Sequence, residues 1–412
     1  MAYERKIIND PVHGFISIPR GLLYDLVRHP LLQRLQRIKQ LGLSAVVYPG
    51  AQHTRFQHSL GTYHLVSQAV GHLQARGQFI FDSEAEAVMA AALLHDIGHG
   101  PFSHVLEHTI TQGVSHEDLS LLLMERINRE MGGQLSLAIR IFRDDYPKHF
   151  LHQLVSGQVD MDRLDYLRRD SFYTGVNEGT VGAARLIEML DVKDDRLVVE
   201  AKGIYSLEQL LTARRLMYWQ VYLHKTSVAY ERMLVSALLR AKELVAQGVE
   251  VFASPALAYF LSHDVSWRTV TTDPLCIEHF IQLDDSDIWT ALKVWCTHPD
   301  RVLATLSQGM VNRWTFKVER LDAPAPQARL DQLANAIGHR LGISTDLAAH
   351  YLVTTTDIAQ RMYDPADDSI DVVYRDGSVR SIAEASDMLN LPTLSKMVKK
   401  HYLCYWRTHD RS

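Results

Sequence analysis

The sequence predicts a mainly helical protein that carries small β insertions and ends in an α+β module. Apolar residues recur at helical spacing over long stretches, as Leu31, Leu35 and Ile38 do. An alanine-rich run over residues 84–94 is rich in helix formers and apolar on most sides, which indicates a buried helix. Strand-like patterns are short and few: residues 15–18, 196–201 and 370–382.

Composition bounds the class of protein. With 412 residues and 47% apolar residues, we expect two or three domains with a large core. The net charge of −5 argues against a broad nucleic-acid-binding surface. No uncharged apolar run reaches about 18 residues, so we expect no membrane span, and we see no signal peptide. Three scattered cysteines indicate a reducing, cytoplasmic compartment.

The first elements follow from turn signals and helical spacing. Asn9-Asp10-Pro11 and His13-Gly14 predict turns before the strand over residues 15–18. A helix is expected from about residue 30 to residue 41. Its polar face is either a solvated charged face or a phosphate contact, and the pattern leaves both open: Gln33, Arg34, Arg37, Lys39 and Gln40.

The buried run over residues 84–94 ends in His95-Asp96. Burying an imidazole beside a carboxylate is costly unless something pairs with them, and a metal ion does so. Taken alone, the pair is equally consistent with a satisfied core. Adjacent helical residues point about 100° apart, so further ligands must come from other segments.

Two residues are candidates for those further ligands. His58 lies where a helical pattern begins, and Asp162 lies in a helix-like run rich in carboxylates and arginines. With His95 and Asp96 they would form a His₂Asp₂ site. Mixed nitrogen and oxygen ligands suit Mn, Fe, Zn or Ni, and Mg²⁺ is a candidate second ion.

The remaining elements place other motifs. Ser115 is a plausible N-cap for a helix that opens at His116-Glu117. Helices are expected over residues 207–245 and 285–296, with a β insertion at 196–201 between earlier helices. Prolines near residue 321 divide the chain into residues 1–320 and 321–412. In the second part, Asp376-Gly377 predicts a strand–turn–strand unit, followed by a short helix over residues 383–389.

A metal-bound water is a usable nucleophile near neutral pH, and attack on phosphorus also needs positive groups and an acid. Arg55 and Arg163 flank predicted ligands and are phosphate candidates. Lys225 and Arg214 are weaker candidates, equally consistent with surface charges. The acid–base candidates are His99, His104 and His116, and the carboxylate of Glu117 would favour the charged form of His116.

These motifs occur together in one known family. His95 to His104, Arg55 to Gly61, residues 33–42, His116-Glu117 and residues 160–170 match in order, as does the stretch from Lys6 to Gly14. The chain resembles the HD-domain metal-dependent phosphohydrolases, most closely the deoxynucleoside triphosphate (dNTP) triphosphohydrolases. The resemblance implies an HD-domain helical core and a reaction at the α-phosphorus that releases triphosphate and a deoxynucleoside.

The resemblance also implies roles for residues. His116 would be the general acid, and His99 and His104 would contact phosphates. Tyr166 and Asp170 would hold the sugar, Gln40 would read its 3′-hydroxyl, and Tyr222 would pack beneath it and exclude ribonucleotides. A homodimer or homotetramer with a nucleotide activator between subunits is expected, at Lys6, Ile7, Asn9 and Gln33.

The chain also departs from the family pattern. Arg28 and Gln36 replace an aspartate and an arginine that read the activator base in vertebrate members, and Leu223 replaces a glutamine. Another HD phosphohydrolase, such as a nucleotidase or phosphodiesterase, therefore stays an alternative. A non-catalytic nucleotide sensor is a further alternative, although the intact ligand set with an acid argues against it.

Overall fold

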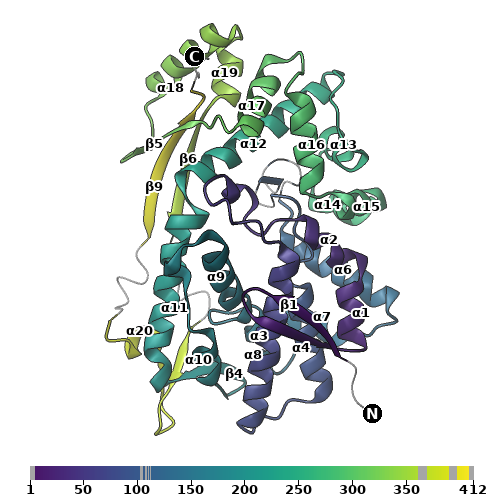
Figure 1. Cartoon of the computed structure of the whole chain (residues 1–412), viewed down its shortest axis with the longest axis vertical. Coiled ribbons are helices and arrows are strands. Elements are labelled where there is room, and N and C mark those ends of the chain that lie inside the picture. Colours follow the sequence, from purple (N-terminus) through teal and green to yellow (C-terminus); the bar gives the residue numbers. More distant parts are fainter. Residues whose placement is uncertain are drawn as a thin grey trace.

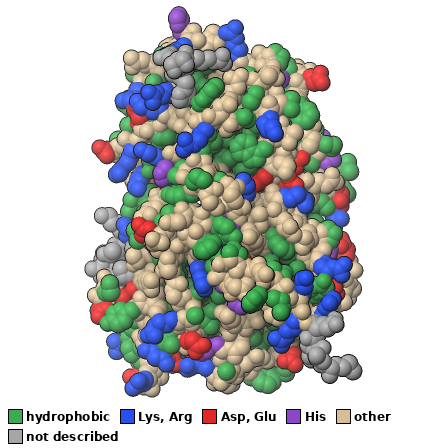
Figure 2. Space-filling view, in the orientation of Figure 1, with side chains coloured by type: hydrophobic (Ala, Val, Ile, Leu, Met, Phe, Trp, Pro, Cys, Tyr) green, Lys and Arg blue, Asp and Glu red, His purple; other side chains and the backbone are tan. Residues whose placement is uncertain are grey.

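The computed structural model describes residues 5–102, 105, 106, 109, 111, 113–360, 369–388 and 397–407. Most of the described chain is helical, which confirms the predicted fold class (Figure 1). One continuous apolar core joins the elements. On the face seen in Figure 2, acidic and basic side chains are scattered among apolar ones. No helix within the described residues is long and apolar enough to span a membrane.

The chain begins with an antiparallel hairpin of β1 (Arg5–Asp10) and β2 (Gly14–Pro19), which confirms the predicted turn and strand. Asp10 holds the turn, because its Oδ1 accepts the backbone N–H groups of Val12 and His13, each at 2.9 Å. Gly14 supplies the left-handed conformation there, with φ of 75°. Helices α1 (Leu22–Arg28) and α2 (Pro30–Arg34) follow.

The predicted helix over residues 30–41 is wrong in its second half. After α2 the chain makes a 3₁₀ turn (Leu35–Arg37), and Ile38 is extended. Lys39 forms a β-bridge with Thr54, and its N–H donates to Asp285 Oδ2 at 3.1 Å. The bridge itself is held by the Gln40 N–H, which donates to the His53 carbonyl oxygen, and by the Arg55 N–H, which donates to the Ile38 carbonyl oxygen, each at 3.0 Å. Backbone groups that a longer helix would use are thus engaged by distant segments that the local pattern cannot show.

Arg34 corrects the prediction of a solvated face. It is only 2% exposed and donates to the carbonyl oxygens of Leu283 and His99. Burial lowers the pKa of Arg34 to about 10, which still leaves it charged at neutral pH. The side chain therefore does not face solvent; it fixes the turn that contains His99.

Helix α3 packs against α4 and α9, and this group forms the centre of the lower half of Figure 1. The prediction of a buried helix ending at His95 is confirmed by α4. Ser115 caps α6 by accepting the Asp118 N–H at 3.0 Å. Gly98 lets α6 approach, because a Cβ there would lie 2.2 Å from the His116 carbonyl oxygen. The helices are α3 (Arg55–Ala75), α4 (Asp82–Leu94), α6 (His116–Glu130), α7 (Ser136–Phe142), α8 (His149–Val155) and α9 (Met161–Thr174).

The predicted continuous helix over residues 207–245 is interrupted. Helix α11 (Ile204–Met217) widens into a π turn (Tyr218–Tyr222), and α12 (Lys225–Ala246) starts anew. His224 separates the two by capping α12, since its Nδ1 accepts the Thr226 N–H at 3.2 Å. Before α11 lie α10 (Ala183–Glu188), β3 (Leu190–Lys193) and β4 (Arg196–Glu200), which confirm the β insertion.

The C-terminal part adds helices and two small sheets. The predicted helix over residues 285–296 is confirmed by α16, and the predicted strand–turn–strand unit is confirmed by β7 and β8. The short helix expected over residues 383–389 ends at Ala385, and residue 389 lies outside the described residues. The elements are α13 (Pro255–Ser262), α14 (Trp267–Thr272), α15 (Pro274–Gln282), α16 (Asp285–Trp295), α17 (Arg301–Asn312), β5 (Lys317–Leu321), α18 (Gln327–Leu341), α19 (Thr345–Tyr351), β6 (Val353–Gln360), β7 (Asp371–Val373), β8 (Val379–Ser381), α20 (Ile382–Ala385) and β9 (Val398–Tyr405).

The sheets tie this part to the rest of the chain. Strand β7 pairs in parallel with β4, so the sheet order is β3-β4-β7-β8. Strand β9 lies between β5 and β6 along one side of the molecule (Figure 1). The predicted boundary near residue 321 stays a prediction.

Candidate active site

Three segments that are distant in sequence bring potential metal ligands together. His58 lies in the first turn of α3, His95 directly follows α4, and Asp162 lies in the first turn of α9. Their ligand atoms all lie within 4.8 Å of one another. His58 Nε2 is 2.9 Å from Asp162 Oδ1 and 3.2 Å from His95 Nε2.

Hydrogen bonds on the far side of each imidazole decide which nitrogen faces this group. His58 Nδ1 donates to Asp165 Oδ2 at 2.8 Å, and His95 Nδ1 donates to the Ala92 carbonyl oxygen at 2.7 Å. Because both acceptors can only accept, each Nδ1 carries a proton, and each Nε2 of a neutral ring presents a lone pair. Two lone pairs and a carboxylate oxygen thus converge. A divalent cation stabilises such an arrangement, so the residues fit a metal ion.

Asp96, the fourth predicted ligand, lies beside this group. Its Oδ1 is 3.5 Å from His95 Nε2, and its Oδ2 is 3.8 Å from His58 Nε2. Arg55 Nη1 donates to Oδ2 at 2.6 Å, and His99 Nε2 lies 3.2 Å from Oδ1. Burial opposes the charged form, but His99 and Arg55 hold the pKa of Asp96 well below its usual range. Asp96 is therefore a carboxylate within reach of an ion, and its role as a ligand stays a prediction.

The same contacts set the protonation of the group. Burial lowers the pKa of His58, but hydrogen bonds with Asp162 and Asp165 outweigh it and raise that pKa to about 10. Burial raises the pKa of Asp162, yet His58 and His95 hold it below its usual range. A proton and a cation compete for the same imidazole lone pair, so metal binding at this site would release a proton.

His99 and His116 form a stacked pair next to Asp96, with ring centroids 4.0 Å apart and an interplanar angle of 18°. Burial and the charge of Arg55 lower the pKa of His99 to about 3, so this ring is neutral at pH 7. His116 is the first residue of α6 and is half-buried. The stack holds the His116 imidazole at the edge of the metal group.

A cavity of about 340 Å³ opens onto this group, a size within the range of small-molecule sites. Ten of its lining residues were predicted as site residues: Gln40, Arg55, His58, Asp96, His99, His116, Asp162, Tyr166, Asp170 and Tyr222. Nine more were not assigned to the site from sequence: Lys39, Leu41, Gly42, Leu43, Ser44, Phe102, Val105, Tyr218 and Glu231.

The end of the cavity away from the metal group is rigidly built. Tyr222 donates its hydroxyl to Asp170 Oδ2 at 2.7 Å, and His53 Nε2 lies 2.7 Å from Asp170 Oδ1. The Tyr222 ring meets Tyr166 and Tyr218 edge-on, with centroids 6.0 Å and 5.2 Å away. Burial and Asp170 hold the pKa of Tyr222 well above its usual range, so its hydroxyl stays a donor.

Other predicted residues lie outside the cavity lining. Arg163 Nη1 donates to the Gly157 carbonyl and pairs with Asp160, and Arg214 Nη1 donates to Gln158 Oε1 at 3.1 Å. Glu117 and Lys225 are exposed. His104 lies outside the described residues. The roles of these side chains stay predictions.

The predicted activator residues lie away from the cavity. Lys6, Ile7 and Asn9 are exposed on β1, and Gln33 Nε2 donates to the Val27 carbonyl at 2.6 Å. No ligand role for them follows from these contacts alone.

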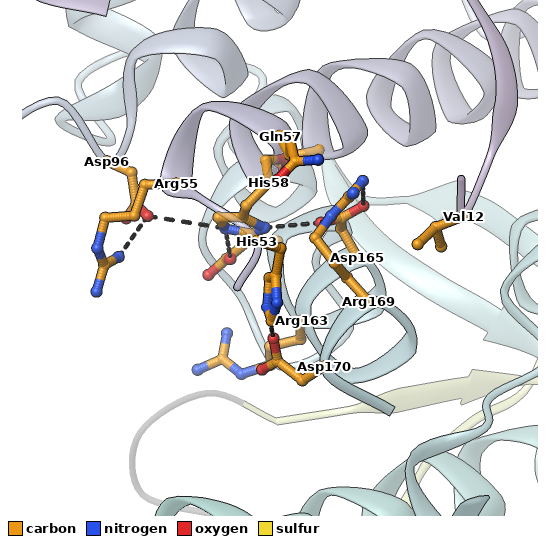
Figure 3. A network of polar contacts seen from close by, with 12 residues as sticks. Val12, His53, Arg55, Gln57, His58, Asp96, Arg163, Asp165, Arg169 and Asp170 are labelled. Carbon is orange, nitrogen blue, oxygen red and sulfur yellow. Dashed lines mark hydrogen bonds and ion pairs between the residues drawn. The ribbon is translucent and has the colours of Figure 1, made fainter. Parts of the chain in front are cut away.

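Sequence analysis missed the residues that hold the site from behind. Asp165 contacts His58 across 107 residues of sequence, and His53 contacts Asp170 across 117. His13 and Arg169 in turn contact Asp165. Figure 3 shows Asp165 and Arg169 on the far side of His58 from Asp96. For Asp165 and Arg169 the local signal was the density of carboxylates and arginines over residues 160–170.

Comparison with known proteins agrees with this geometry. The HD domain family model matches residues 55–170, and a model of the HD associated region matches residues 181–254. A crystal structure of a phosphohydrolase from Bacteroides thetaiotaomicron is 70% identical with a TM-score of 0.96, over 98% of this chain and 100% of that one. The uncharacterized Bacillus subtilis protein YwfO is 30% identical over 93% of this chain and 88% of its own.

Human deoxynucleoside triphosphate triphosphohydrolase SAMHD1 is 28% identical over 68% of this chain, which spans 51% of the human protein's length. The Dictyostelium discoideum homolog of that enzyme is 33% identical over 58% of this chain and 50% of its own. The residues that the HD domain model matches include the predicted ligands of α3, α4 and α9. The chain belongs to the HD-domain phosphohydrolases, the family that includes the SAMHD1 dNTP triphosphohydrolases.

Proposed function

We propose that this protein is a metal-dependent dNTP triphosphohydrolase. The observation that carries the proposal is the single cavity that joins the His58, His95 and Asp162 group to the Tyr222–Asp170 pair. One end offers ligands for a cation beside basic groups, and the other offers a rigid aromatic wall with hydrogen-bonding groups. A nucleotide has the same division, with phosphates at one end and a sugar at the other.

His58, His95 and Asp162 would hold the ion, with Asp96 as the fourth ligand. When bound, a divalent ion activates water and polarises a phosphoryl oxygen. Arg55, whose Nη1 is 2.6 Å from Asp96, presents fixed positive charge where negative charge develops in the reaction. The family resemblance implies that His99 contacts a phosphate, and His116 would protonate the leaving oxygen.

The sugar end supports a deoxyribose. Gln40 lines the cavity, and its buried Oε1 has no hydrogen-bond partner among the described residues, so it is free to accept from a sugar hydroxyl. Tyr222 cannot turn aside without breaking its bond to Asp170, so its ring would clash with a 2′-hydroxyl. Activation by a nucleotide bound between subunits is part of the proposal and rests on the family resemblance.

The test is product analysis. Purified protein supplemented with Mn²⁺ is incubated with each dNTP singly and with all four together, and products are separated by anion-exchange chromatography. We expect equimolar triphosphate and deoxynucleoside, with turnover only in the mixture if one nucleotide activates hydrolysis of another. Release of phosphate or pyrophosphate would contradict the proposed bond cleavage. Cleavage of a nucleoside monophosphate or cyclic nucleotide alone would favour another HD phosphohydrolase.

A variant pair assigns the chemistry to the cavity. His116→Ala should lower kcat by about 10²–10⁴-fold, the usual contribution of a general acid. His149→Ala is the matched control. His149, the first residue of α8, forms a hydrogen bond with Asp144 and does not line the cavity. Equal activities of the two variants would contradict the role of His116.

A further inference from the structure

One carboxylate behind the metal group has every acceptor position filled. Asp165 is fully buried on α9. Its Oδ2 accepts from His58 Nδ1 and from Arg169 Nε, both at 2.8 Å. Its Oδ1 accepts from His13 Nε2 at 2.6 Å and from Arg169 Nη2 at 3.0 Å. A carboxylate offers about four lone-pair sites, so these four contacts leave Asp165 one orientation.

The other end of this network is the β1–β2 hairpin. Arg169, also fully buried, donates from Nη1 to Asp10 Oδ2 at 2.8 Å. Asp10 Oδ1 accepts the backbone N–H groups of Val12 and His13 and so fixes the backbone of the turn that carries His13. Both supports of Asp165 other than His58 therefore depend on Asp10.

Helix α3 is shaped to admit the network. Gly61 lies less than one helical turn after His58, and a Cβ there would lie 1.8 Å from Asp165 Oδ1 and 2.4 Å from Arg169 Nη2. The bare backbone at residue 61 lets the carboxylate and the guanidinium sit directly against α3. The ion pair is thus packed at the base of the helix turn that presents His58.

We propose that Asp165 is a positioning residue of the metal centre and that the β1–β2 hairpin, through His13 and Asp10, is part of that centre's support. The proposal rests on the metal site of the proposed function. Asp165 keeps the proton of His58 on Nδ1, which leaves the Nε2 lone pair directed at the ion, and it fixes the ring plane. Partners of this kind behind a ligand are typically worth 10–100-fold in metal affinity.

A merely structural ion pair would behave differently. Its loss would lower the stability of the metal-free protein and leave the affinity of the remaining folded protein for metal unchanged. Metal affinity and metal-free stability are therefore the two quantities to separate, and neither depends on turnover.

The test measures the Kd for Mn²⁺ alone by calorimetric titration of chelator-treated full-length protein, and the melting temperature before and after metal addition. We expect Asp165→Asn to raise the Kd by about 10–100-fold, because an amide cannot accept all four donors. Asp10→Asn should raise it by less. Glu84→Gln is the matched control: Glu84 is equally buried and accepts from Lys148 and Tyr146, but at the opposite end of α4 from His95. It should lower stability and leave the Kd unchanged.

A second pair tests the hairpin if Asp165→Asn does not fold. His13→Gln keeps an N–H donor toward Asp165, and His13→Leu removes it at similar volume. We expect the Leu variant to bind Mn²⁺ more weakly than the Gln variant. Wild-type affinity in every folded variant, with lowered stability, would overturn the positioning role alone. Absence of Mn²⁺ binding by the wild-type protein would overturn the metal site itself.

Discussion

Gly61→Ala tests whether α3 and α9 meet as closely as the structure shows. In an exposed helix interior this change stabilises by about 1 kcal/mol, because Ala is the better helix former. Here the added Cβ would lie 1.8 Å from Asp165 Oδ1, far inside van der Waals contact. Overpacking a core costs about 1–3 kcal/mol, and partly unpairing a buried ion pair costs about 3–5 kcal/mol. The net effect should be a loss of at least about 2 kcal/mol.

Gly71→Ala is the matched control on the same helix, because a Cβ there meets nothing within 4 Å. Urea unfolding of metal-free protein should show Gly71→Ala at or above wild-type stability and Gly61→Ala well below it. The Gly61 variant should also bind Mn²⁺ more weakly, since the displaced Asp165 no longer holds His58. If Gly61→Ala matches Gly71→Ala in stability and wild type in metal affinity, the close packing of Asp165 against α3 is wrong.

Three further predictions concern protonation, specificity and metal loss. Burial, only partly opposed by the hydrogen bond from the Lys39 N–H, raises the pKa of Asp285 from 3.8 to about 7. The folded state therefore favours the protonated carboxyl, and the stability of the protein falls as the pH rises from about 4 to about 7. Asp285→Asn should therefore stabilise the protein more at pH 8 than at pH 5, by at most about 3 kcal/mol, as unfolding measured at the two pH values would show. A gain independent of pH would contradict this. Tyr222→Ala should raise kcat/KM for ribonucleotides relative to dNTPs by about tenfold or more. Tyr222→Phe, which keeps the ring but loses the bond to Asp170 that fixes it, should lose less of the discrimination, as competition assays would show. Chelation should abolish hydrolysis and lower the melting temperature, and Mn²⁺ should restore both; activity that survives complete metal removal would exclude the mechanism.

The candidate metal ligands could be proposed from sequence because their chemistry is partly local. His95-Asp96 at the end of an apolar helix is a costly pair without a ligand, and His58 and Asp162 each lie at a helix start. The supports could not be predicted in this way. Asp165 meets His13 across 152 residues, and Arg34 meets Leu283 across 249, contacts that no spacing rule reveals.

The same limit explains the errors in the predicted helices. The apolar pattern over residues 31–41 is helical, but the Lys39 N–H donates to Asp285 and the Gln40 N–H donates to the His53 carbonyl oxygen. The π turn at Tyr218–Tyr222 likewise breaks a continuous helical pattern and places two tyrosines in the cavity. In both places tertiary contacts outweigh the local helical preference, and in both the segment that departs from the α-helix lines the cavity.

The most direct test of the account is the position of the metal. An anomalous difference map from crystals of the Mn²⁺-loaded protein should show one peak within about 2.0–2.2 Å of His58 Nε2, His95 Nε2 and an Asp162 oxygen, as for first-row ions on such ligands. A peak that also touches Asp96 would complete the predicted set. Stoichiometric Mn²⁺ bound elsewhere, with these three side chains unliganded, would contradict the central claim.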